Sequence, residues 1–174
     1  MGPTSVLRDG NLRYSSTADQ WNIVTSTMAM SSGKWYCEIT TSTTSLPDTA
    51  WGIRAASITT TLNTYPYLNN EFVLFVNQGY YTDGAYTTDG TPIGSFAPGD
   101  VCGMALDMDA GTLTYYQNGR LLGTAFTNIA GKGPMYWCSA ADKFEVDDTW
   151  NFGASKFKYP APAGFLALCD TNLT

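Results

Sequence analysis

Residues 99–119 read GDVCGMALDMDAGTLTYYQNG, and this stretch decides the fold. Cys102, Met104 and Leu106 recur at every second position, which is the period of a β-strand with one face buried. Asn118 and Gly119 form a dipeptide that favours a two-residue hairpin turn. We therefore predict a three-stranded meander, with strands at 101–107, 112–117 and 120–126.

The same alternation continues on both sides of this meander. Trp35, Cys37 and Ile39 alternate with Tyr36 and Glu38, which predicts a half-buried strand over 34–41. No long segment has the spacing of an amphipathic helix. About ten short strands, separated by turn signals at roughly 8–12 residues, are typical of a β-sandwich. Further strands are predicted at 51–56, 71–76, 133–140 and within 142–153, and we expect one all-β domain over residues 1–174, either complete or a module of a larger protein.

Charge and hydropathy exclude several classes of function. The chain has a net charge of -6, and its nine basic residues are scattered, so we expect no binding to nucleic acid or to anionic membranes. No segment approaches the roughly 20 consecutive apolar residues that cross a bilayer, and the first residues lack the pattern of a signal peptide. We expect a soluble domain without membrane insertion.

The reactive side chains argue against an enzyme. The chain has no histidine, which excludes Ser-His-Asp and Cys-His nucleophiles and Cys/His zinc sites. Glu38 has no second carboxylate beside it, as a glycosidase would need. The four cysteines form no CxxC pair and stand among apolar residues, so we predict buried free thiols in place of disulfides. We expect no catalytic residues, no metal and no cofactor.

Two acidic motifs carry the carboxylate oxygens that a cation site needs. Asp107, Asp109 and Gly111 resemble the start of a calcium loop, but Thr112 and Asn118 stand where a glycine and a bidentate carboxylate are needed. We interpret these aspartates as caps of a tight turn. The pair Asp147 and Asp148 allows a surface cation site, with solvated charge as the favoured interpretation.

Tyrosine and tryptophan give the candidate binding residues. Several of the eleven tyrosines fall in predicted loops among Gly, Ser, Thr and Asn, as in antibody paratopes and sugar-stacking sites. The alternative is that these rings pack under the loops. Tryptophans 35, 51, 137 and 150 are predicted to be core residues, and the position of Trp21 is left open. The predicted ligand-binding residues are Tyr65, Tyr67, Tyr80, Tyr81, Tyr86, Asp142 and Lys143, in loops at 42–50, 57–70, 79–92 and 139–148.

The order of motifs resembles the SPRY (B30.2-type) domain family. The matching segments are GKWYCEI at 33–39, WGI at 51–53, GDVCGMALD at 99–107, GTLTYYQNG at 111–119 and NFG at 151–153. This resemblance implies a concanavalin-like sandwich of two antiparallel sheets that binds proteins or peptides through loops at one edge and is not an enzyme. Residues 57–70 match no family pattern, so the ligand does not follow from it.

The C-terminal segment, YPAPAGFLALC at 159–169, looks like the end of SPRY modules in bacteriophage structural proteins. This resemblance implies a virion component, in a tail fibre or on the head, which recognises a host glycan or protein. A second hypothesis is a domain that cements virion subunits together. A third is a cytoplasmic adaptor that binds a short peptide.

Overall fold

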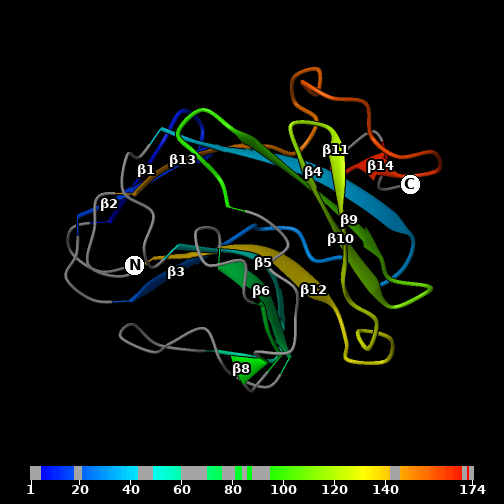
Figure 1. The fold of residues 1–174 in the computed structure, drawn as a ribbon. Helices are drawn as coiled ribbons and strands as arrows, with labels where there is room; N and C mark the ends of the chain where they lie inside the picture. Colours follow the sequence, from blue (N-terminus) through cyan, green and yellow to red (C-terminus); the bar gives the residue numbers. More distant parts are fainter. Residues whose placement is uncertain are drawn as a thin grey trace.

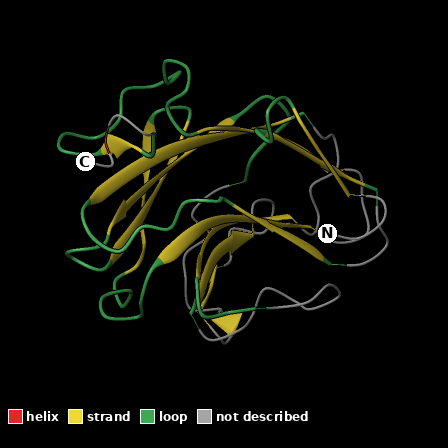
Figure 2. Cartoon of the chain, turned by 180° about the vertical axis from the view of Figure 1, so that it is seen from behind, coloured by secondary structure: helices red, strands yellow, loops and turns green. Residues whose placement is uncertain are grey.

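Two antiparallel β-sheets pack face to face in the computed structural model, which describes residues 5–17, 21–42, 49–59, 70–75, 81–83, 86–87, 95–141, 146–169 and 172. Figure 1 shows the two layers, and Figure 2 shows the strands and connecting loops from behind. The prediction of a two-sheet antiparallel sandwich is confirmed.

The larger sheet has the strand order β1-β2-β13-β4-β9-β10-β11, and β14 also pairs with β4. The smaller sheet has the order β3-β12-β5-β6-β7-β8. The strands of the larger sheet are β1 (Ser5–Arg8), β2 (Arg13–Ser16), β13 (Val146–Asn151), β4 (Lys34–Thr41), β9 (Val101–Asp107), β10 (Thr112–Gln117), β11 (Arg120–Phe126) and β14 (Leu166–Ala167). Those of the smaller sheet are β3 (Asn22–Thr25), β12 (Met135–Ala141), β5 (Thr49–Ala55), β6 (Glu71–Phe75), β7 (Tyr81–Asp83) and β8 (Tyr86–Thr87).

The predicted meander is present as β9, β10 and β11 with the predicted bounds. Asp107 caps the first turn, because its Oδ1 accepts hydrogen bonds from the amides of Asp109 (3.1 Å) and Ala110 (2.8 Å). Its Oδ2 lies 2.8 Å from Lys34 Nζ. The interpretation as a turn cap is confirmed for Asp107. Asp109 is not such a cap, because its Oδ1 accepts a 2.9 Å hydrogen bond from the amide of Gly33 in another segment.

The main core fills the space between the sheets. Trp51 and Trp137 are fully buried there, and Tyr115 donates a 2.9 Å hydrogen bond from its hydroxyl to the carbonyl of Trp51 in the opposite sheet. Trp150 is buried as predicted, whereas Trp35 is only partly buried at the border of this core. Trp21 packs edge-on against Phe75 in a second cluster.

None of the four cysteines forms a disulfide bond. The thiols of Cys37, Cys102 and Cys138 are buried, and that of Cys169 is half-buried. Burial in apolar surroundings raises the pKa of each of the three buried thiols. The predicted burial is confirmed for these three cysteines.

The C-terminal segment folds over the outer face of the larger sheet (Figure 1). The carboxylate of Glu38 accepts hydrogen bonds from the amides of Lys158 (2.7 Å) and Tyr159 (2.8 Å). Phe157 packs edge-on against Tyr36, with 4.9 Å between ring centroids. Strand β4 was predicted to be half-buried, but Tyr36 and Glu38 on its outer face are buried too, because this segment covers them.

Other predictions from the sequence are corrected. Tyr81 and Tyr86 begin the short strands β7 and β8, where loop residues were predicted. Strands β1, β2 and β3 precede position 34, where the sequence analysis placed none. Asp148 was interpreted as solvated, but it is fully buried between the sheets, because its side chain faces inward while that of Asp147 faces outward to Arg13.

Candidate binding sites

Several of the predicted loops begin and end at one end of the sandwich. Thr41 pairs with Asp148 near the start of β13, Ala141 pairs with Thr49, and Phe75 pairs with Ala50. The strand ends that flank 42–48, 76–80 and 142–145 therefore lie together. We call this region the loop end.

The residues that flank the predicted loop at 57–70 lie elsewhere. Arg54 pairs with Glu71, whereas Ala50 pairs with Phe75, so the residues on either side of 57–70 stand at the opposite end of the smaller sheet. The resemblance implied a binding surface at one edge of the sandwich. The described strands do not bring the flanks of all four predicted loops to a single edge.

Most of the predicted ligand-binding residues fall outside the described chain. These are Tyr65, Tyr67, Tyr80, Asp142 and Lys143. For Tyr81 and Tyr86 the structure gives the backbone position only, in β7 and β8 of the smaller sheet. The assignment of these seven residues to a binding site stays a prediction.

A hydrogen-bonded group connects the two sheets at the base of the loop end. Asp148 Oδ2 accepts hydrogen bonds from Trp51 Nε1 and from Ser139 Oγ, each 2.9 Å long. Burial of the carboxyl raises the pKa of Asp148 to about 6. These contacts hold β13 of the larger sheet against β5 and β12 of the smaller sheet.

On the outer face of the same strand, Asp147 forms a second polar group. Its carboxylate receives two hydrogen bonds from the guanidinium of Arg13 and one of 2.8 Å from Ser42 Oγ. This hydrogen bonding lowers the pKa of Asp147, with the bond from Arg13 as the main cause. The carboxylate is therefore engaged in structure and is not simply solvated.

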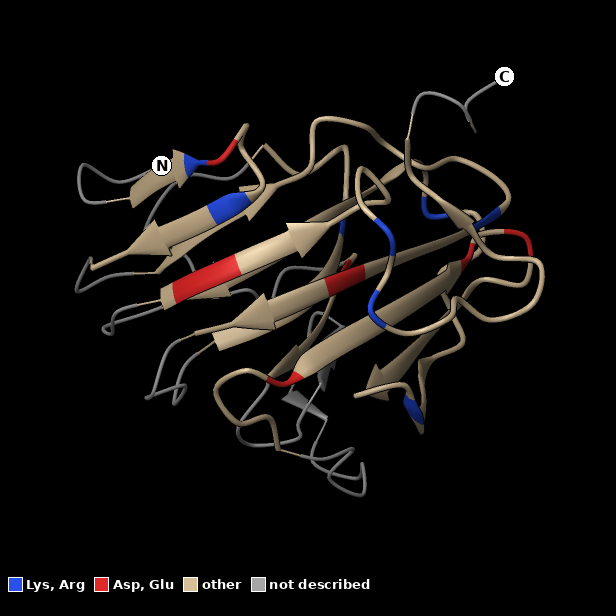
Figure 3. Ribbon diagram, turned by 90° about the horizontal axis from the view of Figure 1, so that it is seen from above, with Lys and Arg blue, Asp and Glu red and all other residues tan. Residues whose placement is uncertain are grey.

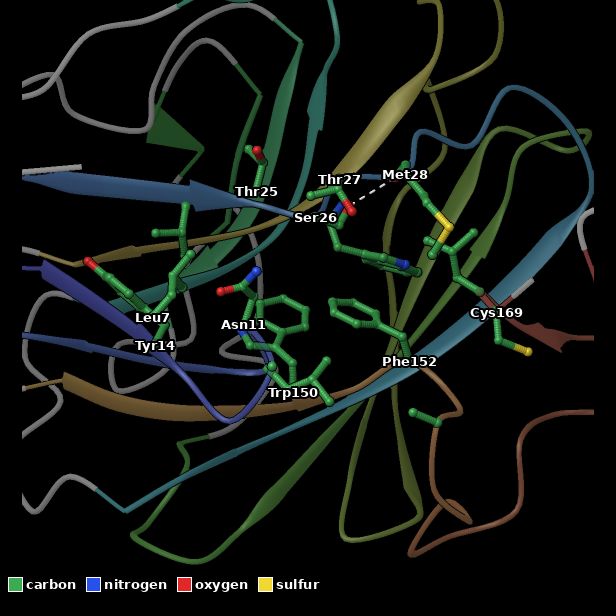
Figure 4. Close-up of a pocket in the computed structure, with 16 residues that line it drawn as sticks. Leu7, Asn11, Tyr14, Thr25, Ser26, Thr27, Met28, Trp150, Phe152 and Cys169 are labelled. Atoms are coloured by element: carbon green, nitrogen blue, oxygen red, sulfur yellow. Dashed lines mark hydrogen bonds between the residues drawn. The ribbon is translucent and has the colours of Figure 1, made fainter. Parts of the chain in front are cut away.

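A cavity of about 320 Å³ opens at the side of the sandwich, between the two sheets. We call it the side pocket. Figure 4 shows its lining, to which β1, β2, β3, β12, β13 and the C-terminal segment contribute. Trp150 and Phe152 form one wall as a stacked pair, with ring centroids 5.2 Å apart and an interplanar angle of 19°. The lining residues are Leu7, Gly10, Asn11, Leu12, Tyr14, Val24, Thr25, Ser26, Thr27, Met28, Trp137, Trp150, Phe152, Ala154, Leu168 and Cys169.

Nothing in the sequence analysis pointed to the side pocket. Ten of the sixteen lining residues lie within 7–28, where no strand was predicted, and the other six lie more than 100 residues further along the chain. The run NIVT at 22–25, with two β-branched apolar residues, was a usable signal for β3. No local pattern could have shown that β3 lies opposite Phe152.

Neither a metal-binding cluster nor a membrane-spanning helix is present among the residues that the structure describes. No group of three or more carboxylates and thiols is placed there to hold a metal ion. That part of the chain also contains no helix of the length and apolarity needed to cross a bilayer. Lys and Arg residues are scattered and not gathered along one face (Figure 3).

Comparison with known proteins identifies a matching family model and similar proteins. The family model described as the SPRY domain matches residues 34–149. The E3 ubiquitin-protein ligase RKP of Arabidopsis thaliana is 30% identical over 135 residues, which cover 74% of this chain and 10% of that protein. This chain therefore spans about a tenth of the plant relative.

Two solved structures share the fold. The SPRY domain of human HERC1 superposes with a TM-score of 0.73 at 14% identity, over 87% of this chain and 94% of that one. A second human SPRY domain superposes with a TM-score of 0.69, also at 14% identity, over 88% of this chain and 98% of that one.

Proposed function

We propose that this chain, which belongs to the SPRY domain family, is a protein-recognition module whose loop end contacts the partner. SPRY domains are generally non-catalytic modules for protein interaction. We assign contact to the segments at 42–48, 76–80 and 142–145, and to Tyr81 and Tyr86 in the adjoining strands β7 and β8.

The observation that carries this proposal is the construction of the loop end. Three segments that are distant in sequence are flanked by strand ends that lie together. The buried contacts of Asp148 with Trp51 and Ser139 join the two sheets directly beneath them. Binding loops function best on a rigid scaffold, because less order has to be gained when the partner binds.

The virion hypothesis rests on the sequence of the C-terminal segment. In the structure this segment has a role within the domain, because Glu38 binds its amides and β14 pairs with β4. Recognition of a host glycan, contact with virion subunits and a place in a virion or in the cytoplasm stay predictions.

A binding experiment separates these functions. The labelled domain is applied to a displayed library of peptides and, separately, to a bacterial glycan array. We expect saturable peptide hits that the double variant Tyr81→Ala, Tyr86→Ala weakens at least tenfold. The variant Leu121→Ala is the control, since Leu121 is 57% exposed on β11 in the other sheet.

The opposite result is equally informative. Specific glycan hits with no peptide hits would replace protein recognition by glycan recognition. Peptide hits that the double variant leaves unchanged would retain the function and remove these two tyrosines from the site.

A further inference from the structure

We propose that the side pocket and the outer edge of β3 form a second binding site, which takes an extended, uncharged segment of a partner protein. The segment pairs with β3 through main-chain hydrogen bonds and places one large apolar side chain in the side pocket. This site is separate from the loop end and does not depend on the function proposed for it.

Strand β3 forms one edge of the smaller sheet as described. β3 pairs with β12 on one side, and no other described strand pairs with it on the other. A strand edge presents main-chain N–H and C=O groups that an extended peptide can bind. The main-chain groups of Ile23 and Thr25 face this edge, because Val24 pairs with Ser139 of β12, and Thr25 also lines the side pocket.

The side chains of β3 alternate between the inner and outer faces of the smaller sheet. Val24 faces inward, where it lines the side pocket and packs near Tyr14. Ile23 packs instead against the second cluster, which contains Trp21 and Phe75. A strand added beside β3 would lie about 4.8 Å away and would also alternate its side chains between the two faces. Its inward side chains would therefore enter the space between the sheets, which is where the side pocket lies.

The lining of the side pocket determines which kind of side chain can enter it. None of the lining residues carries a charge, and the stacked rings of Trp150 and Phe152 form one wall. A buried charge without a partner is costly, so a charged side chain is excluded from this cavity. A volume of about 320 Å³ accommodates a large aliphatic or aromatic side chain.

Position and composition favour a protein segment as the occupant. A free apolar molecule would fill the side pocket but would leave the outward main-chain groups of Ile23 and Thr25 unused. The polar lining side chains Asn11 and Thr27 are exposed at the surface of the cavity, where they suit the backbone of a bound segment.

The test uses blocked hexapeptides of the series acetyl-TVTXTV-amide, in which X is varied through all amino acids except proline. We expect the peptides with Phe, Leu, Trp or Met at X to bind at least tenfold more tightly than those with Asp or Lys. Methylation of alternate backbone nitrogens in the Phe peptide should abolish binding, because it removes the strand pairing. N-acetylphenylalaninamide, which has the ring without the strand, should bind at least tenfold more weakly.

Two exposed neighbouring positions give a matched pair of variants. Ala154 lines the side pocket and Ser155 does not, and both are exposed. We expect Ala154→Trp to fill the cavity and weaken the Phe peptide at least tenfold, while Ser155→Trp leaves its affinity unchanged. Because both substitutions are at the surface, unfolding by denaturant should be the same for both variants.

Cys169 is one of the residues that line the side pocket, and we expect the reactivity of its half-buried thiol to change when the side pocket is occupied. Saturating Phe peptide should slow its reaction with a thiol reagent at least fivefold. Equal affinity for Phe and Asp peptides, or no effect of Ala154→Trp, would overturn the proposal. So would a dimer in sedimentation that Ala154→Trp dissociates, because the occupant would then be a second copy of this chain.

Discussion

Trp51 Nε1 donates a 2.9 Å hydrogen bond to Asp148 Oδ2, and this contact joins the two sheets at the base of the loop end. The carboxyl is fully buried, and burial raises its pKa to about 6. In the unfolded chain the same group titrates near its ordinary value of 3.8. A single carboxyl therefore makes the stability of this sandwich depend on pH.

The first prediction concerns that pH dependence. Between pH 4 and pH 6 the unfolded chain loses the proton of Asp148 before the folded chain does, so the free energy of unfolding falls as the pH rises. A shift of this size corresponds to about 3 kcal/mol. Urea unfolding from pH 4 to pH 7 should show the fall in the wild type and not in Asp148→Asn. Asp100, Asp107 and Asp147, whose pKa values are lowered, act in the opposite direction in both proteins. Equal slopes would show that Asp148 does not titrate in this range.

The second prediction concerns the other donor to this carboxylate. Ser139→Ala removes the 2.9 Å hydrogen bond from Ser139 Oγ and leaves Asp148 buried with one donor fewer. We expect a loss of about 1.5–3 kcal/mol at pH 7, because the acceptor is ionised there. The loss should be smaller at pH 4, where the carboxyl is protonated. Thermal unfolding at both pH values measures this, with the exposed Ser155→Ala as the control. A cost that is the same at both pH values would contradict it.

The third prediction concerns Glu38 and the C-terminal segment. Both oxygens of its carboxylate accept backbone hydrogen bonds, and Glu38→Gln replaces one of these oxygens with a donor. We expect faster hydrogen exchange at the amides of Lys158 and Tyr159 and a loss of about 1–3 kcal/mol of stability. Exchange in the β9–β10 hairpin is the internal control. Unchanged exchange at residues 158–159 would mean that other contacts hold the segment.

The fourth prediction compares two glycines. A Cβ atom at Gly52 would lie 2.0 Å from the main-chain oxygen of Phe72, so Gly52→Ala must push β5 away from β6. Gly99 has a φ of +86° and open space around its Cα. For Gly99→Ala we expect a cost of roughly 1–2 kcal/mol from the backbone conformation alone. Denaturant unfolding should show the larger loss for Gly52→Ala, and the reverse order would contradict the close approach of these strands.

The fifth prediction concerns the thiols. Cys37, Cys102 and Cys138 are buried and their pKa values are raised, so a thiol reagent should not modify them in the folded protein. Cys169 is half-buried and should react first. One fast equivalent followed by three at the rate of unfolding is the expected time course. Cys169→Ser should remove the fast phase, and a fast phase that persists would place another thiol at the surface.

The class of fold and its most regular part follow from local patterns in the amino-acid sequence. The strands of the meander were predicted with their bounds, because alternation, the Asn118–Gly119 turn and the cap at Asp107 are local signals. Such signals act between residues close in the chain, and they can be read without knowing what each strand faces.

The contacts between side chains across the sandwich do not follow from local sequence patterns and are known from the tertiary structure. Asp147 and Asp148 are neighbours of the same type, yet one binds Arg13 on the outer face and the other is buried against Trp51. Glu38 and Tyr159, which form a hydrogen bond, are 121 residues apart. The side pocket likewise combines β3 with a wall from β13 and the segment after it. These contacts depend on the order and packing of strands that are distant in sequence, and a two-residue period carries no information about that order.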